Sequence, residues 1–221
     1  VISIFQFPLI WLLVPAGCSR DPESLLGLGS LTCEMLQRGS GPRSSREFIE
    51  QLEMLGVDSS ASVSNAHTSF GGAMPAESLE QTLAIFADAV RRPHLAEDQF
   101  EDSQMVCLQE FHSLDDDPAQ KAMLELRQRC YPDPYGRSSQ GTEESLLRVT
   151  PEDVRHFFVR QYRPNQAILS VAGRVDWSRL QDHVERLFGD WQPAEELPIA
   201  ETASRGGYRH LAQESRQTHI G

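Results

Sequence analysis

The residues of this chain best placed for chemistry lie on one short stretch, GLGSLTCEMLQRG, at positions 27–39. The spacing of its apolar residues predicts a helix over about residues 24–38, ended by Gly39. Cys33 and Glu34 lie on this helix, and a cysteine thiolate can act as a nucleophile or bind a metal ion. Nucleophilic chemistry requires a nearby base and a lowered thiol pKa, and the sequence names no such base. A buried structural thiol is therefore the simpler interpretation of Cys33.

Other polar residues that could form a site also have simpler interpretations. His67 is expected to be a surface or hydrogen-bonded histidine, because no partner lies at a metal-ligand spacing from it. His112 follows Glu110 by two positions, which on a helix turns the two side chains apart. The acidic run at 115–117 precedes Pro118 but lacks the alternate spacing and closing Glu of a calcium loop. We expect this run to end one helix and cap the next.

Composition limits the class of protein. The chain has 221 residues and 39% hydrophobic content, enough for one large domain or two small ones with a core. Its 32 acidic and 20 basic side chains give a net charge of −12, with no Lys/Arg-rich run that could neutralise a row of phosphates. We therefore expect no nucleic-acid binding. The sequence has no GxGxxG, Walker or GxSxG motif. Dinucleotide binding, a phosphate-binding P-loop and a serine hydrolase with a nucleophile elbow therefore have no support.

The cysteines and the N-terminus bear on the compartment. Cys18, Cys33, Cys107 and Cys130 form no CxxC pair and no zinc-ribbon spacing, so we expect four separate buried thiols. Separate thiols favour a reducing compartment such as the cytoplasm. The apolar stretch VISIFQFPLIWLLVPAGC lacks a basic region, is interrupted by two prolines and is shorter than the roughly 20 residues of a spanning helix. It predicts a buried strand over residues 3–14 and no membrane association.

The remaining pattern alternates helices with a few strands. Ser44 and Glu47 fit a capping box, and Thr150 followed by Pro151 fits a helix start. Helices are expected over residues 45–55, 77–91, 96–113 and 119–130, from residue 151 and after residue 176. A hairpin or two sheet strands are expected within 57–74, and a strand over 167–172. This order predicts an α+β fold with a mostly antiparallel sheet packed with helices.

The composition after residue 191 becomes rich in Pro, Ala, Glu and Ser, which is typical of a linker. We therefore expect a domain over residues 1–191, a linker over 192–215, and the start of a truncated second domain over 216–221. The chain begins on Val1 rather than Met, which also suggests a piece of a longer protein.

The order of elements over residues 3–191 resembles the N-terminal half of the pitrilysin/insulinase metallopeptidases, the inverted zincins. Four stretches in order carry the resemblance: AGCSRDPESLLGLGSLTCEMLQRGS, SREFIEQLEMLG, MVCLQEFHSLDDDPAQ, and the segment from YPDPYGRSSQGT to LSVAGRVDW. Each stretch alone is weak, whereas their order and spacing together are specific. The resemblance implies an α+β domain of a clamshell protein that closes around a peptide.

The motif of that family is His-x-x-Glu-His on a helix, whose histidines bind zinc together with a distal Glu while the inner Glu activates water. The resemblance places Ser30 and Glu34 at the histidine positions and Cys33 at the general base. It places Glu110, 76 residues after Glu34, at the distal ligand. The two carboxylates are one ligand short of a catalytic zinc site, and without a cation one would tend to hold a proton. We therefore expect a degenerate site with no zinc and no catalytic residue.

A second family feature is an Asn-Ala-x-Thr sequence near the strand that contacts substrate. The stretch NAHTS at 65–69 is similar to it. Counting without gaps from Gly56, however, puts Ser60 and Ala61 at that place. The NAHTS stretch is therefore expected to be an ordinary strand or turn.

The resemblance implies three alternative functions. The first is a non-catalytic member that binds an extended polypeptide, as partner half or subunit of a zinc-bearing peptidase in a dimer or larger assembly. The second is a purely structural scaffold, similar to the core subunits of the respiratory bc1 complex. The third is an active peptidase with altered chemistry through Cys33 or Glu34. A cleft lined by small polar residues would favour peptide binding, and a cleft filled by its own side chains would favour the scaffold.

Overall fold

An antiparallel sheet with helices on one side forms the framework of the domain. The computed structural model describes residues 7–115, 117–195, 198–203 and 206–210. Its main sheet has the strand order β4–β5–β1–β6, and every neighbouring pair is antiparallel. The strands are β1 (Leu9–Val14), β4 (Asp58–Val63), β5 (Thr68–Ala73) and β6 (Ile168–Ala172), and a separate small hairpin pairs β2 (Gly39–Ser40) with β3 (Arg43–Ser44). The predicted α+β class with an antiparallel sheet is confirmed.

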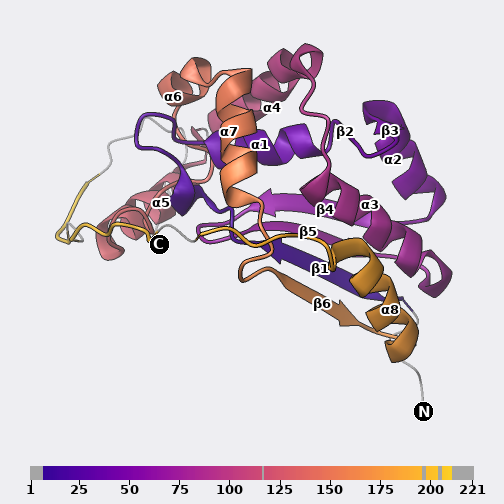
Figure 1. Ribbon diagram of the computed structural model, residues 1–221. Helices are drawn as coiled ribbons and strands as arrows, with labels where there is room; N and C mark the ends of the chain where they lie inside the picture. The colour runs from indigo at the N-terminus through magenta and orange to yellow at the C-terminus, as the bar shows by residue number, and fades with distance from the viewer. Residues whose placement is uncertain (1–6, 116, 196–197, 204–205, 211–221) are drawn as a thin grey trace.

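The central strand β1 shows why the two faces of the sheet differ. Ile10, Leu12 and Val14 are buried, whereas the alternating Leu9 and Trp11 are exposed. The helices pack on the face of the buried residues, and Figure 1 shows α1, α3 and α7 on the same side of the sheet. Strand alternation therefore directs one apolar row of β1 into the core and the other away from it.

Helices α1 to α8 largely follow the predicted pattern. Their bounds are α1 (Leu28–Leu36), α2 (Ser45–Met54), α3 (Leu79–Arg91), α4 (Phe100–Asp115), α5 (Pro118–Cys130), α6 (Glu143–Arg148), α7 (Pro151–Gln161) and α8 (Trp177–Phe188), and short 3-10 turns lie at Cys18–Arg20, Ala76–Ser78 and Glu97–Gln99. The capping box of Ser44 and Glu47 is confirmed, and Thr150 and Asp153 form another at the start of α7. Asp117 caps α5, as expected for the acidic run.

The structure differs from the expected elements in three places. Helix α1 begins at Leu28 rather than near residue 24, because Gly27 adopts a left-handed conformation (φ 93°) before it. Helix α6 and the β2–β3 hairpin lie in stretches for which the sequence analysis predicted no helix or strand.

Two further expectations concern the burial of the four cysteines and the presence of membrane-spanning helices. Cys18, Cys33 and Cys107 are buried free thiols, but Cys130 is exposed, so the expectation that all four are buried is wrong for the last residue of α5. Helix α5 buries none of its residues, which explains that exposure. In the described part of the chain, no helix is both long and apolar enough to cross a bilayer.

The segment after α8 is held against the domain at several points. Ala194 exchanges two hydrogen bonds with the side chain of Asn165, at 2.8 and 2.9 Å. Further along, Thr202 N–H donates to the carbonyl of Asp133 at 2.9 Å. Figure 1 shows this segment crossing from α8 back towards α5. Residues 211–221, which include the predicted start of a second domain, lie outside the described residues, so the division at 191 and 215 stays a prediction.

Gly141 should be among the least replaceable glycines. Its φ is +67°, and a Cβ there would lie 2.1 Å from the carbonyl oxygen of Leu26. Gly56 has nearly the same φ, +66°, but its nearest neighbour would be Pro75 at 3.5 Å. Both Gly→Ala changes carry the left-handed cost of about 1–2 kcal/mol, and only G141A adds a backbone clash. We expect urea denaturation to show a loss of more than about 3 kcal/mol for G141A and about 1 kcal/mol for G56A. Equal losses would contradict this account.

Candidate functional site

Helix α1 carries the vestigial motif and is one of the most buried helices of the domain. It contacts α4, α7 and β4. Seven of its nine residues are buried, and the two partly exposed ones are Ser30 and Glu34, one turn apart. Burial of its large apolar side chains contributes about 1.5–3 kcal/mol each. The helix is therefore positioned by packing, and two of its three motif residues, Ser30 and Glu34, lie on the same accessible side.

Asp21 fixes the start of α1, a role that motif spacing did not reveal. Its two carboxyl oxygens accept N–H bonds from Gly27 at 2.8 Å and Gly29 at 2.9 Å. Arg137 also donates to the Asp21 carbonyl at 2.7 Å. Burial raises the pKa of Asp21 to about 7, while the two N–H donors and Arg137 act to lower it. The sequence signal for this role is the position of Asp21, six residues before Gly27.

Ser30 and Cys33 are occupied by structural roles. The Ser30 hydroxyl donates to the carbonyl of Ser139 at 2.6 Å, which ties α1 to the loop before α6. Cys33 is only 4% exposed and belongs to the apolar core. Burial, followed by the negative charge of Glu34, raises the pKa of the Cys33 thiol far above its usual range. A thiol of this kind is a poor nucleophile, because the thiolate is the reactive form.

Glu34 and Glu110 are brought together from α1 and α4. Partial burial and then the charge of Glu34 raise the pKa of the Glu110 carboxyl. The Cys107 thiol lies in the same neighbourhood, since burial and then these two carboxylates raise its pKa to about 12. Glu34 has a cationic partner, Arg38, whose Nη2 lies 2.5 Å from its Oε1. The sequence analysis missed both Cys107 and Arg38, although the i,i+4 spacing of Glu34 and Arg38 is a usable signal.

The side chains at the motif positions do not fit a catalytic zinc ion. The Ser30 hydroxyl is already a hydrogen-bond donor, and the Cys33 thiol is buried in the core. Glu34 is paired with the cation of Arg38, which competes for the same carboxylate. Within the described residues, no group of three or more His, Cys, Asp or Glu side chains is arranged to hold a metal ion. That Ser30, Cys33, Glu34 and Glu110 are remnants of a zinc site stays a prediction from the resemblance.

Strand β4, which contacts α1, forms one edge of the main sheet. Ser64 N–H donates to the carbonyl of His67 at 2.8 Å, so these residues form a hydrogen-bonded pair at the hairpin end. Antiparallel pairs alternate, which turns the backbone N–H and C=O groups of Ser59, Ala61 and Val63 away from β5. No other described strand pairs with this edge. The edge therefore presents a row of backbone groups beside α1.

The two stretches compared with the family's substrate-contacting sequence lie in different parts of the hairpin. Ser60 and Ala61 lie within β4, on the edge strand itself. Asn65 lies in the β4–β5 turn, where its side-chain amide donates to the carbonyl of Tyr135 at 2.6 Å. His67 is also in that turn, and its N–H donates to Ser64 Oγ at 3.1 Å. The interpretation of NAHTS as strand or turn is confirmed.

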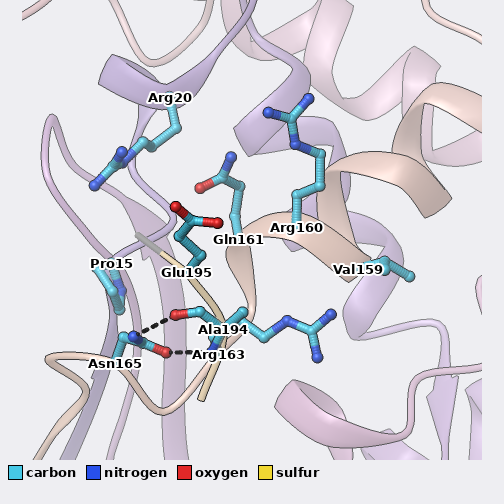
Figure 2. Close-up of a pocket in the computed structure, with 9 residues that line it drawn as sticks. All are labelled: Pro15, Arg20, Val159, Arg160, Gln161, Arg163, Asn165, Ala194 and Glu195. Carbon is cyan, nitrogen blue, oxygen red and sulfur yellow. Dashed lines mark hydrogen bonds between the residues drawn. The ribbon is translucent and has the colours of Figure 1, made fainter. Parts of the chain in front are cut away.

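A pocket at the end of α7 is a separate feature, with a volume of about 310 Å³. Arg20, Arg160 and Arg163 line it together with residues of the segment after α8. Figure 2 shows the three guanidinium groups pointing in different directions rather than at a common point. The paired Asn165 and Ala194 are also among its lining residues, and no residue of α1 or α4 lines it.

The four thiols should differ sharply in reactivity. Cys130 is exposed, whereas burial raises the pKa of Cys18 to about 11 and that of Cys107 to about 12, and raises that of Cys33 further. In native protein at pH 8, we expect iodoacetamide to label Cys130 at least about 100-fold faster than the other three. Peptide mapping by mass spectrometry measures the four rates, with urea-unfolded protein as the control. Rapid labelling of native Cys33 would show that it is accessible as a nucleophile.

Comparisons with known proteins find similar sequences over most of the chain. The family described as Insulinase (Peptidase family M16) matches residues 6–143, and the family described as Peptidase M16 inactive domain matches residues 148–220. An uncharacterized zinc protease of Rickettsia felis is 24% identical over 210 residues, which cover 95% of this chain and 51% of the relative. A probable mitochondrial-processing peptidase subunit beta of Arabidopsis thaliana is 21% identical over 180 residues, covering 81% of this chain and 34% of the relative.

Solved structures show the same fold. A protease from Helicobacter pylori superimposes with a TM-score of 0.79 at 20% identity, covering 90% of this chain and 49% of the other. The first half of the periplasmic protease PqqL from Escherichia coli gives a TM-score of 0.80 at 20% identity, over 91% and 45% of the two chains. The chain spans about half the length of the Rickettsia relative. With one M16 match covering more than half of its residues, the chain belongs to the insulinase family of M16 peptidases.

Proposed function

We propose that this chain is a non-catalytic half of an M16 peptidase assembly and binds an extended polypeptide along the free edge of β4. The observation that carries the proposal is the position of that edge beside α1, with the backbone groups of Ser59, Ala61 and Val63 directed outward. A peptide strand added there would form main-chain hydrogen bonds without a metal ion or a catalytic side chain.

The side chains along β4 suit a backbone-directed site. Its sequence, DSSASV, consists mainly of small polar residues, and Ser59, Ser60 and Ser62 are exposed. The small side chains of Ser62 and Ser69 pair across the hairpin at 3.0 Å. This lining favours peptide binding over the scaffold alternative, for which a cleft filled by the protein's own side chains was expected.

The charge of the chain favours one class of peptide. Its net charge of −12 attracts basic polypeptides and repels acidic ones at moderate ionic strength. A basic or neutral extended segment is therefore the preferred ligand. Complementary charge acts mainly on the association rate and is weakened by salt.

The catalytic alternative is less well supported by the motif residues. Cys33 is buried in the core, and Glu34 is paired with Arg38. Several relatives of about twice the length are named zinc proteases, and the matched structures include halves of longer proteases. We infer that a second M16 half supplies the zinc motif and completes the chamber in which the peptide is held.

Metal content tests the non-catalytic part of the proposal. In purified full-length protein, we expect E34Q and E110Q to leave the zinc content measured by elemental analysis unchanged, because any zinc is bound by the second half. The change in melting temperature caused by a chelator should also be the same in both variants as in the unmodified protein, because a metal stabilises the fold that binds it. Loss of about one zinc per chain in either variant would contradict the proposal.

Substitutions at Ala61 test the binding edge. Proline at an edge strand removes an N–H that does not bond to β5, so A61P should fold while obstructing an added strand. We expect A61P to weaken binding of a fluorescent basic 15-residue peptide at least about tenfold, since each lost hydrogen bond costs about 0.5–1.5 kcal/mol and the ring adds a steric obstacle. A61S keeps the N–H and should bind normally.

The variant S60P is the matched control for the effect of a proline on the fold of β4. Its N–H faces β5, so S60P should lower the melting temperature by disrupting the hairpin ladder. Fluorescence anisotropy measures affinity, and circular dichroism checks the fold of each variant. Unchanged peptide affinity in well-folded A61P would place the peptide site elsewhere or exclude it.

A further inference from the structure

Arg38 lies just beyond the end of α1, where its side chain turns back towards the motif. It follows the C-cap residue Gln37, and its Nη2 lies 2.5 Å from Oε1 of Glu34. The two side chains are only 24% and 21% exposed. The ion pair is therefore shielded from water on most sides and belongs to the site rather than to the open surface.

Another helix of the chain offers an ordinary pair for comparison. Glu144 and Arg148 have the same spacing and order, but their side chains are 77% and 58% exposed. Exposed pairs of this kind contribute little, because water and salt screen the two charges. For the shielded pair of Glu34 and Arg38, removal of one partner would leave an uncompensated charge with reduced solvation.

A second observation indicates that Arg38 is held in place by charge. Its Nε is buried and has no hydrogen-bond partner among the described residues. Burying an unpaired donor is unfavourable, so another interaction must hold the guanidinium in this position. The ion pair with Glu34 is the contact that does so, and Arg38 also interacts favourably with the C-terminal end of the α1 dipole.

The facing helix α4 adds further negative charge to the same place. Glu110 on α4 interacts electrostatically with Glu34, and Cys107 on α4 interacts with both carboxylates and with Arg38. Two carboxylates from packed helices repel each other unless a cation lies near them. Arg38 is the cation that the structure places within hydrogen-bond distance of Glu34.

We propose that Arg38 is the built-in countercharge of the α1–α4 interface, and that its guanidinium compensates the carboxylate of Glu34 at the place where zinc peptidases of this family carry their metal. The correspondence of this place to the metal site rests on the family motif, whereas the ion pair is a contact of this structure and does not rest on the motif. The proposal explains how α1 packs against α4 with the Glu34 carboxylate at the interface, close enough to Glu110 for the two charges to interact. It does not depend on peptide binding at β4.

The test is a charge-neutralising substitution in the full-length protein, measured by thermal melting at low salt. R38M keeps the length and the apolar stem of the side chain but removes the charge. We expect R38M to lower the melting temperature by about 4 °C or more and R148M by less than about 1 °C. R38K, which retains a positive charge, should keep most of the stability.

A double variant separates charge from packing. If Arg38 acts as a countercharge, adding E34Q to R38M should recover at least half of the lost melting temperature, because the uncompensated carboxylate is removed as well. Should R38M fail to fold, recovery of a folded double variant would support the proposal equally. Equal melting temperatures of R38M and R148M, or a double variant no more stable than R38M, would overturn it. These readouts are independent of peptide affinity, so they also separate this proposal from the proposed function.

Discussion

The burial of α1 between the sheet and helices α4 and α7 is the constraint on which the site depends. Its apolar side chains fill the centre of the core, and Asp21 holds its first turn through two N–H bonds. Neither interaction requires a metal ion. Helix α1 is therefore needed for folding even without catalytic side chains at the positions that the resemblance assigns to the zinc motif.

Charge as well as packing matters at the interface of α1 and α4. In a zinc site, the ion's positive charge compensates its carboxylate ligands. Here the carboxylates of Glu34 and Glu110 remain near each other, and Arg38 provides positive charge from the end of the same helix. Ser30 donates a hydrogen bond to the loop before α6, and Cys33 lies in the apolar core. Three of the four positions that the resemblance assigns to a zinc site therefore have structural interactions.

The sequence was most informative where the physics is local. The capping box of Ser44 and the Thr150–Pro151 start gave helix boundaries correctly, because capping involves residues three apart in the chain. The resemblance to the family pairs Glu34 with Glu110, and the two residues lie on α1 and α4, which contact each other. Neither periodicity nor composition alone would have paired residues so far apart.

The features that the sequence did not predict depend on contacts between residues far apart in the chain. Helix α6 has only six residues, and its position depends on Ser145 donating to the carbonyl of Leu26, more than a hundred residues away in sequence. Cys130 is exposed because α5 finds no partner for its outer face, which no residue count could reveal. The role of Arg38 likewise depended on the shielding of its ion pair, a property of the packed helices rather than of the spacing.

The edge of β4 connects these observations to function. A peptidase needs its substrate backbone aligned before chemistry can occur, and alignment by strand addition uses only main-chain groups and a free edge. Binding and catalysis are therefore physically separable on this fold. The edge does not depend on the side chains at the motif positions, because β4 is held by β5 and α1. The polypeptide binding that we propose therefore requires no hydrolysis by this chain.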